Sequence, residues 1–118
     1  RSKAEDKVRK AGFDPARLPP GQYFTEKWPV LHAGDIPDVD LATWTLTLSG
    51  EVEEPVTLTY EELTALPATE VTTDIHCVTR WSRFDAQFKG VHWSELAKLC
   101  KPKPSARFAI AHAARSLA

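Results

Sequence analysis

In the stretch LATWTLTLSG at 41–50, residues 43–49 alternate polar and apolar side chains without a break. Trp44, Leu46 and Leu48 fall on one face, and the intervening threonines fall on the other. Successive side chains of a β-strand point to opposite faces, so this period of two predicts a half-buried strand of an antiparallel sheet. Such a strand must pair within a sheet, and other side chains must pack on its apolar face. The segment therefore predicts a fold that contains a sheet. The next candidate strand, PVTLTY at 55–60, is expected to pair with it across an acidic turn.

Short helices are predicted where a capping signal precedes a run of helix-forming residues. Ser2 with Glu5, and Thr59 with Glu62, have the three-residue spacing of a capping box. The patterns predict helices at 2–12, 59–66 and 92–100, further strands at 70–78 and 106–113, an extended stretch at 88–91 and a loop at 80–87. The interval 14–40 holds five of the nine prolines and is expected to run extended. Together these elements describe a strand-rich α+β domain.

The charge balance limits the classes of partner. Fifteen Lys and Arg residues against sixteen Asp and Glu give a net charge of −1, whereas nucleic-acid and membrane-surface proteins show a basic excess. No apolar run approaches the roughly 20 residues of a membrane-spanning helix. We therefore expect one globular domain of 118 residues, with no nucleic-acid partner and no membrane span.

The amino terminus bears on the location of the protein. The stretch RSKAEDKVRK is too charged for a secretion signal, which favours a cytoplasmic location. The chain has no methionine, not even at position 1, so we expect that its start was processed or cut. A periplasmic location through a removed leader therefore stays open.

The stretch DIHCVTRWSRFD at 74–85 holds Cys77, one of only two cysteines. A free cysteine most often packs in a core, and Cys100, beside Leu96 and Leu99 on a predicted helix, fits that reading well. A disulfide between the two cysteines is a second possibility. A zinc site is a third, with four candidate ligands: His76, Cys77, His92 and Cys100. No pair of these ligands has the short spacing of a zinc motif.

A cysteine nucleophile is a fourth reading of Cys77. Arg80 and Arg83 would lower the pKa of the thiol. Three histidines are candidates for the base: His76, His92 and His112. No third group that would orient the base is evident.

A longer pattern distinguishes among these readings. HCVTRWSRFDAQFKGVHWSEL at 76–96 resembles the bacterial sulfite-oxidase-like branch of the molybdopterin oxidoreductases, through Cys-Val-x-x-Trp-Ser at 77–82, Lys-Gly-Val at 89–91 and a short helix that contains Leu96. A second block, TEKWPVLHAG at 25–34, looks like the amino-terminal segment of that family. The resemblance runs from about Leu18 to Phe108 and implies the mixed sheet of the sulfite oxidase molybdopterin-binding fold.

The resemblance also implies roles for individual residues. Cys77 would be the protein thiolate bound to molybdenum, with two more sulfurs supplied by the pterin dithiolene, and sulfur donors suit this metal. Arg80 and Arg83 would join it as catalytic residues that bind an anion, since guanidinium groups pair with oxyanions and phosphates. The expected cofactor contacts are Thr25, Lys27, Trp28, His76, Cys77 and Trp81.

The implied function is that of a molybdenum–molybdopterin oxidoreductase, an enzyme when full length. Its reaction would be a two-electron oxygen-atom transfer on a small oxyanion, oxo-acceptor or sulfoxide, with an unidentified electron-transfer partner. The sequence at 77–82 is closer to methionine-sulfoxide reductases of this family than to sulfite oxidases proper. The alternative is a non-catalytic α+β interaction module with a buried structural Cys77.

The resemblance sets the expected domain limits. Residues 1–17 are expected to form a surface helix or arm, and residues 18–118 the amino-terminal part of the molybdopterin-binding domain. Because the family domain continues further, we expect a domain that is incomplete at its carboxyl end and cofactor that is absent from this chain alone. The apolar strand predicted at 106–113 would then favour self-association.

Overall fold

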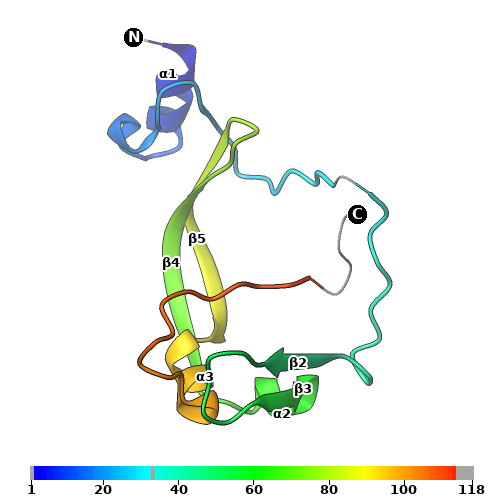
Figure 1. Cartoon of the computed structure of the whole chain (residues 1–118). Coiled ribbons are helices and arrows are strands. Elements are labelled where there is room, and N and C mark those ends of the chain that lie inside the picture. The colour runs from blue at the N-terminus through cyan, green and yellow to red at the C-terminus, as the bar shows by residue number, and fades with distance from the viewer. Residues whose placement is uncertain (1, 33, 114–118) are drawn as a thin grey trace. The chain divides into compact units, whose positions relative to one another are not determined.

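The computed structural model describes residues 2–32 and 34–113. The chain divides into two compact units, Arg1–Leu31 with Glu70–Phe88 and His32–Thr69 with Lys89–Ala118. Helices and strands are both present, and the larger sheet is mixed, so the α+β class is confirmed (Figure 1). No helix in the described ranges combines the length and the apolar character that crossing a bilayer requires.

The larger sheet has three strands in the order β1-β5-β4. The strands are β1 (Tyr23–Phe24), β4 (Ala68–His76) and β5 (Trp81–Val91). β1 runs parallel to β5, with Tyr23 opposite Trp81 and Phe24 opposite Ser82. β4 and β5 follow each other in the chain and form a hairpin, which is prominent in Figure 1. The short strand β1 thereby attaches the amino-terminal segment beside the start of β5.

The first unit is closed by one helix and a cluster of aromatic rings. Helix α1 (Lys3–Lys10) begins with the predicted capping box of Ser2 and Glu5, and a 3-10 turn, η1 (Pro15–Arg17), follows it. Although α1 is mostly polar, Val8 is fully buried against Phe24 and Phe84. Phe13 packs on both rings, with centroid distances of 5.7 and 5.3 Å. The helix is therefore a docked part of this unit.

Arg17 joins the carboxylates at the edge of this core. Its guanidinium lies 4.9 Å from the centre of the Phe84 ring and binds Asp74 at 2.5 Å and Asp85 at 2.6 Å. The hydrogen bond from Arg17 lowers the pKa of Asp74 below its ordinary value. This cluster links η1 to both strands of the hairpin.

The second unit contains the predicted two-stranded sheet. β2 (Thr45–Leu48) pairs antiparallel with β3 (Val56–Thr59). Helix α2 (Tyr60–Thr64) starts at the predicted capping box of Thr59 and Glu62, and α3 (Trp93–Cys100) follows β5. Leu58 and Cys100 are its buried apolar side chains among the described residues. The packing reading of Cys100 is confirmed.

Two predicted elements were wrong. Residues 81–87 of the loop predicted at 80–87 belong to β5, where Phe84 and Ala86 are buried and alternate with Arg83 and Asp85. A fully buried serine, Ser82, disguised this alternation, because its hydroxyl is satisfied by hydrogen bonds rather than by solvent.

The second error is the strand at 106–113, which has no regular structure. Its apolar side chains Phe108 and Ile110 are 93% and 80% exposed. β-propensity alone does not make a strand, because the backbone needs a neighbouring strand for its hydrogen bonds.

Candidate functional site

Cys77 lies in the turn of the β4–β5 hairpin, one residue beyond the end of β4, and not within the strand as predicted. Its N–H donates to the Trp81 carbonyl at 2.9 Å, and its own carbonyl accepts from the Arg80 N–H at 3.0 Å. Arg80 has a φ of +78°, and a left-handed last residue is typical of three-residue hairpin loops. The turn therefore presents a partly exposed thiol at the tip of the hairpin.

The environment of the thiol favours its charged form. The hydroxyl of Thr79 donates to Cys77 Sγ at 3.0 Å. This hydrogen bond, with the backbone N–H groups of Thr79 and Val78, lowers the pKa of the Cys77 thiol below its ordinary value. The two arginines that the sequence suggested for this effect are not its cause. The residue responsible, Thr79, stands two positions after the cysteine, and this short hydroxyl spacing is visible in the sequence although the prediction rested on the arginines.

Arg80 is exposed, and its guanidinium makes no hydrogen bond or ion pair with any residue that the structure describes. A side chain with a Cβ costs about 1–2 kcal/mol in the left-handed region. The turn thus holds an arginine where glycine would fit with less strain. Its charge is free to meet a bound anion.

Arg83 occupies a different environment. Its guanidinium lies 4.8 Å from the centre of the Trp28 ring and donates to the Glu26 carbonyl. Trp28 also meets the edge of Trp81 at 5.9 Å and of Phe88 at 6.1 Å. Arg83 therefore fastens the segment before residue 32 to β5. The prediction that this segment is extended and contacts the region after Cys77 is confirmed.

Three more residues were predicted to contact the cofactor: Thr25 and Lys27, which follow β1, and His76, which ends β4. Thr25 Oγ1 accepts from the backbone of Lys27 at 3.0 Å, and the ammonium of Lys27 is exposed without a partner among the described residues. His76 places Nδ1 2.7 Å from Ser82 Oγ and meets the edge of the Phe84 ring. All these residues belong to the first unit, together with Cys77.

The disulfide, the zinc site and the cysteine–histidine pair considered for Cys77 each require partner residues close to its thiol. Both cysteines are free, so the disulfide is not formed. No group of three or more metal ligands occurs within residues 2–32 and 34–113. His92 caps α3 by accepting from the Ser94 N–H at 3.1 Å, and no histidine among the described residues bonds to Cys77 Sγ. A zinc site and a cysteine–histidine pair are therefore both unsupported.

The donor set instead fits a group that brings most of its own ligands. The turn offers a single thiol that favours its charged form, which is the state that binds metals. Two buried donors nearby in sequence, Trp81 Nε1 and Arg83 Nε, have no partner in the described structure. Buried polar groups are nearly always paired, so each of these donors lacks an acceptor, which a bound ligand would supply. Sulfur-rich and oxygen-rich cofactors meet both requirements.

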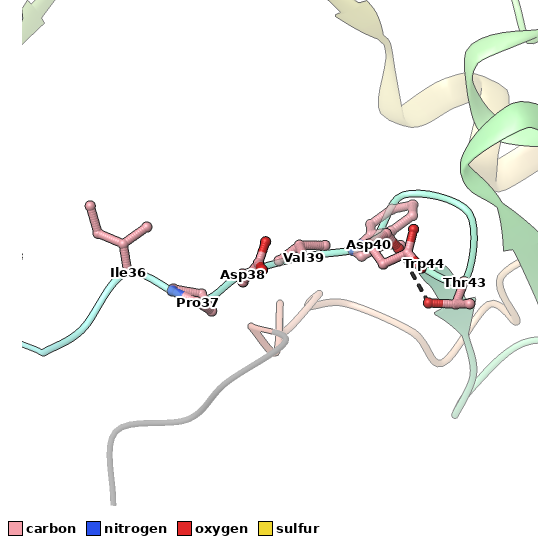
Figure 2. A pocket seen from close by; sticks show the side chains of 7 residues that line it. All are labelled: Ile36, Pro37, Asp38, Val39, Asp40, Thr43 and Trp44. Atoms are coloured by element: carbon pink, nitrogen blue, oxygen red, sulfur yellow. Dashed lines mark hydrogen bonds between the residues drawn. The ribbon is translucent and has the colours of Figure 1, made fainter.

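A hollow in the second unit has a different character. It is lined by Ile36, Pro37, Asp38, Val39, Asp40, Thr43 and Trp44. Figure 2 shows the first five along an extended segment and the last two at the end of the turn that follows it. The carbonyl of Asp40 accepts from the Thr43 hydroxyl at 3.3 Å. The hollow has no thiol, imidazole or cationic side chain, so the Cys77 turn remains the candidate site.

Comparison with known proteins gives the following matches. The family model described as oxidoreductase molybdopterin binding domain matches residues 33–118. An uncharacterized oxidoreductase of Bacillus subtilis, YuiH, is 42% identical over 98 residues, which are 82% of this chain and 50% of that protein. The protein-methionine-sulfoxide reductase catalytic subunit MsrP of Campylobacter jejuni is 32% identical over 65 residues, which are 55% of this chain and 22% of that protein. The matches thus cover half or less of the length of these relatives. No solved structure matches the chain significantly.

Proposed function

Since the chain belongs to the family of oxidoreductase molybdopterin-binding domains, we propose that Cys77 is its ligand to molybdenum. When bound, the molybdenum–pterin group would supply the two-electron redox centre and two further sulfur donors. The observation that carries the proposal is the hydrogen bond from Thr79 to Cys77 Sγ, which favours the thiolate at a partly exposed hairpin tip. A soft thiolate is the type of ligand that such a metal selects.

We propose that the residues around Cys77 divide the remaining tasks. Arg80 would bind the anionic part of the substrate or cofactor, because its guanidinium is exposed and unpaired among the described residues. The pterin contacts would come from Thr25, Lys27, Trp28, His76 and Trp81. Arg83 would act indirectly, since its contacts with Trp28 and the Glu26 carbonyl hold the segment that carries those residues.

The proposed reaction is two-electron oxygen-atom transfer on a sulfoxide. One relative carries the name of a protein-methionine-sulfoxide reductase. In sulfoxide reduction the S–O bond breaks, the sulfur gains two electrons, and the oxygen leaves as water with two protons. An electron donor must supply the two electrons, so an electron-transfer partner forms part of the proposal.

The test is metal and pterin content in the natural full-length protein. Wild-type protein should hold stoichiometric molybdenum, Cys77→Ser should lose it while remaining folded, and Cys100→Ser should retain it. Turnover of methionine sulfoxide should be lost together with the metal. A folded wild-type protein without molybdenum would favour the non-catalytic module. Equal losses in both variants would point to a packing role for the cysteines.

A further inference from the structure

We infer that Gln22 is a positioning residue for Cys77 and acts through a hydrogen-bonded relay with Ser82 and His76. Gln22 precedes β1 directly, and its side chain reaches the Cys77 turn within the first unit. It also lies before residues 33–118, which the family model matches. The existence of the relay is independent of any cofactor, whereas its effect on metal binding rests on the proposed function.

The relay, made of Gln22, Ser82 and His76 with the Cys77 carbonyl, contains three hydrogen bonds. Gln22 Nε2 donates to the Cys77 carbonyl at 3.1 Å, and Ser82 Oγ donates to Gln22 Oε1 at 3.0 Å. His76 Nδ1 lies 2.7 Å from Ser82 Oγ. Ser82 is fully buried at the centre of the relay. Its hydroxyl joins the imidazole of His76 to the amide of Gln22.

One arrangement of protons satisfies the whole relay. A carbonyl only accepts, so the amide NH2 of Gln22 must face Cys77, and its oxygen must face Ser82. The single proton of the Ser82 hydroxyl is then used on Gln22. Ser82 Oγ consequently accepts from His76, which carries a proton on Nδ1. Each member therefore fixes the orientation of the next.

The relay acts on the peptide group from which the Cys77 side chain projects. The Cys77 carbonyl receives two donors, the Arg80 N–H at 3.0 Å and Gln22 Nε2. The backbone next to Gln22 is also attached to the turn, because Tyr23 N–H donates to the Arg80 carbonyl at 2.7 Å. A carbonyl held from two directions cannot rotate freely, so the direction of the Cα–Cβ bond of Cys77 is restricted. The relay thus fixes the backbone position from which the thiol projects, while the hydrogen bond from Thr79 acts on Cys77 Sγ itself.

The experiment uses the full-length protein from a host that makes no molybdopterin. Gln22→Leu and Ser82→Ala are compared with Gln87→Leu, a control on an exposed glutamine of β5. Amide hydrogen exchange is measured at Cys77 and Arg80 and normalised to the core amide of Phe84. Each relay variant should accelerate hydrogen exchange at these two amides about fivefold, which is the effect of losing one hydrogen bond of ordinary strength. The control should match wild type.

A double variant and an isosteric variant test the mechanism. Because the two side chains belong to one relay, Gln22→Leu/Ser82→Ala should exchange only as fast as either single variant, whereas independent contributions would multiply to about 25-fold. Gln22→Glu keeps the shape but cannot donate, so it should behave like Gln22→Leu. Wild-type exchange in Gln22→Leu or Gln22→Glu, uniform acceleration that includes Phe84, or a multiplied effect in the double variant would overturn the inference.

The same variants, produced with cofactor, report the consequence for metal binding. Gln22→Leu should hold less molybdenum than Gln87→Leu. If Cys77→Ser retained its molybdenum, the proposed function would fail, while the exchange data would still decide whether the relay positions the turn.

Discussion

Replacing Arg80 by glycine and, separately, by alanine distinguishes the strain of its backbone from the use of its guanidinium. The φ of +78° at Arg80 is one that glycine adopts freely and that residues with a Cβ resist. Both substitutions delete the guanidinium, but only glycine removes the Cβ. The pair therefore changes the two properties independently.

The size of the difference follows from the backbone conformation. The left-handed region costs a residue with a Cβ about 1–2 kcal/mol. Glycine avoids this cost, but it makes the unfolded chain more flexible, which lowers the free energy of unfolding by about 0.4–1 kcal/mol. The glycine variant should therefore exceed the alanine variant by about 0.5–1 kcal/mol in free energy of unfolding. The exposed Arg80 side chain adds little packing to this balance.

Urea denaturation and sulfoxide turnover measure the two effects in the full-length protein. The glycine variant should unfold at the higher urea concentration, and both variants should lose turnover equally. Arg107→Ala is the matched control, because Arg107 is also exposed but lies outside the first unit. Equal stability of the two Arg80 variants would show that the backbone at Arg80 is not strained. Full turnover in either would refute the role of the guanidinium.

Three further substitutions test the site and its support. Thr79→Val removes the hydrogen bond that lowers the pKa of the Cys77 thiol, so the pH profile of Cys77 alkylation should move to higher pH; an unchanged profile would contradict this cause. Asp74→Asn should destabilise the protein at neutral pH. The pKa of Asp74 is lowered in the folded state. The difference in stability between this variant and wild type should therefore shrink below about pH 4 and vanish once the pH falls below that lowered pKa. A difference between urea midpoints that does not change with pH would be inconsistent with this expectation. Val8→Ala should cost about 2 kcal/mol in urea denaturation, because Val8 is fully buried. Val78→Ala, at a side chain that is 94% exposed, should change stability by less than about 0.5 kcal/mol, and equal costs would show that α1 is not docked.

Elements with a local cause could be predicted from the sequence. The capping boxes at Ser2 and Thr59 begin α1 and α2 as predicted, since the cap and its partner are three residues apart. The threonine–leucine alternation predicted β2 and its antiparallel partner β3. In each case the stabilising residues are local: the capping partners are three positions apart, and β2 and β3 are joined by one short connection.

Elements that depend on a distant partner could not be predicted in this way. The first part of β5 was mistaken for a loop because Ser82 is polar, and hydrogen bonds with His76 and with the distant Gln22 make its burial favourable. The segment at 106–113 has the alternation of a strand but no neighbour to bond with in the described structure. Val8 is a single apolar residue on a charged helix, and its burial depends on Phe24 and Phe84.

By itself the sequence determined the α+β class, the family and the choice of Cys77 as the residue of interest, because the motif around Cys77 is contiguous. The tertiary structure decided how that thiol is presented. It placed Cys77 in a turn, assigned Arg83 to Trp28, and joined Ser82 to a glutamine 60 positions earlier. These contacts form only when β1 pairs with β5, and no pattern within either segment identifies a partner so far away in the sequence.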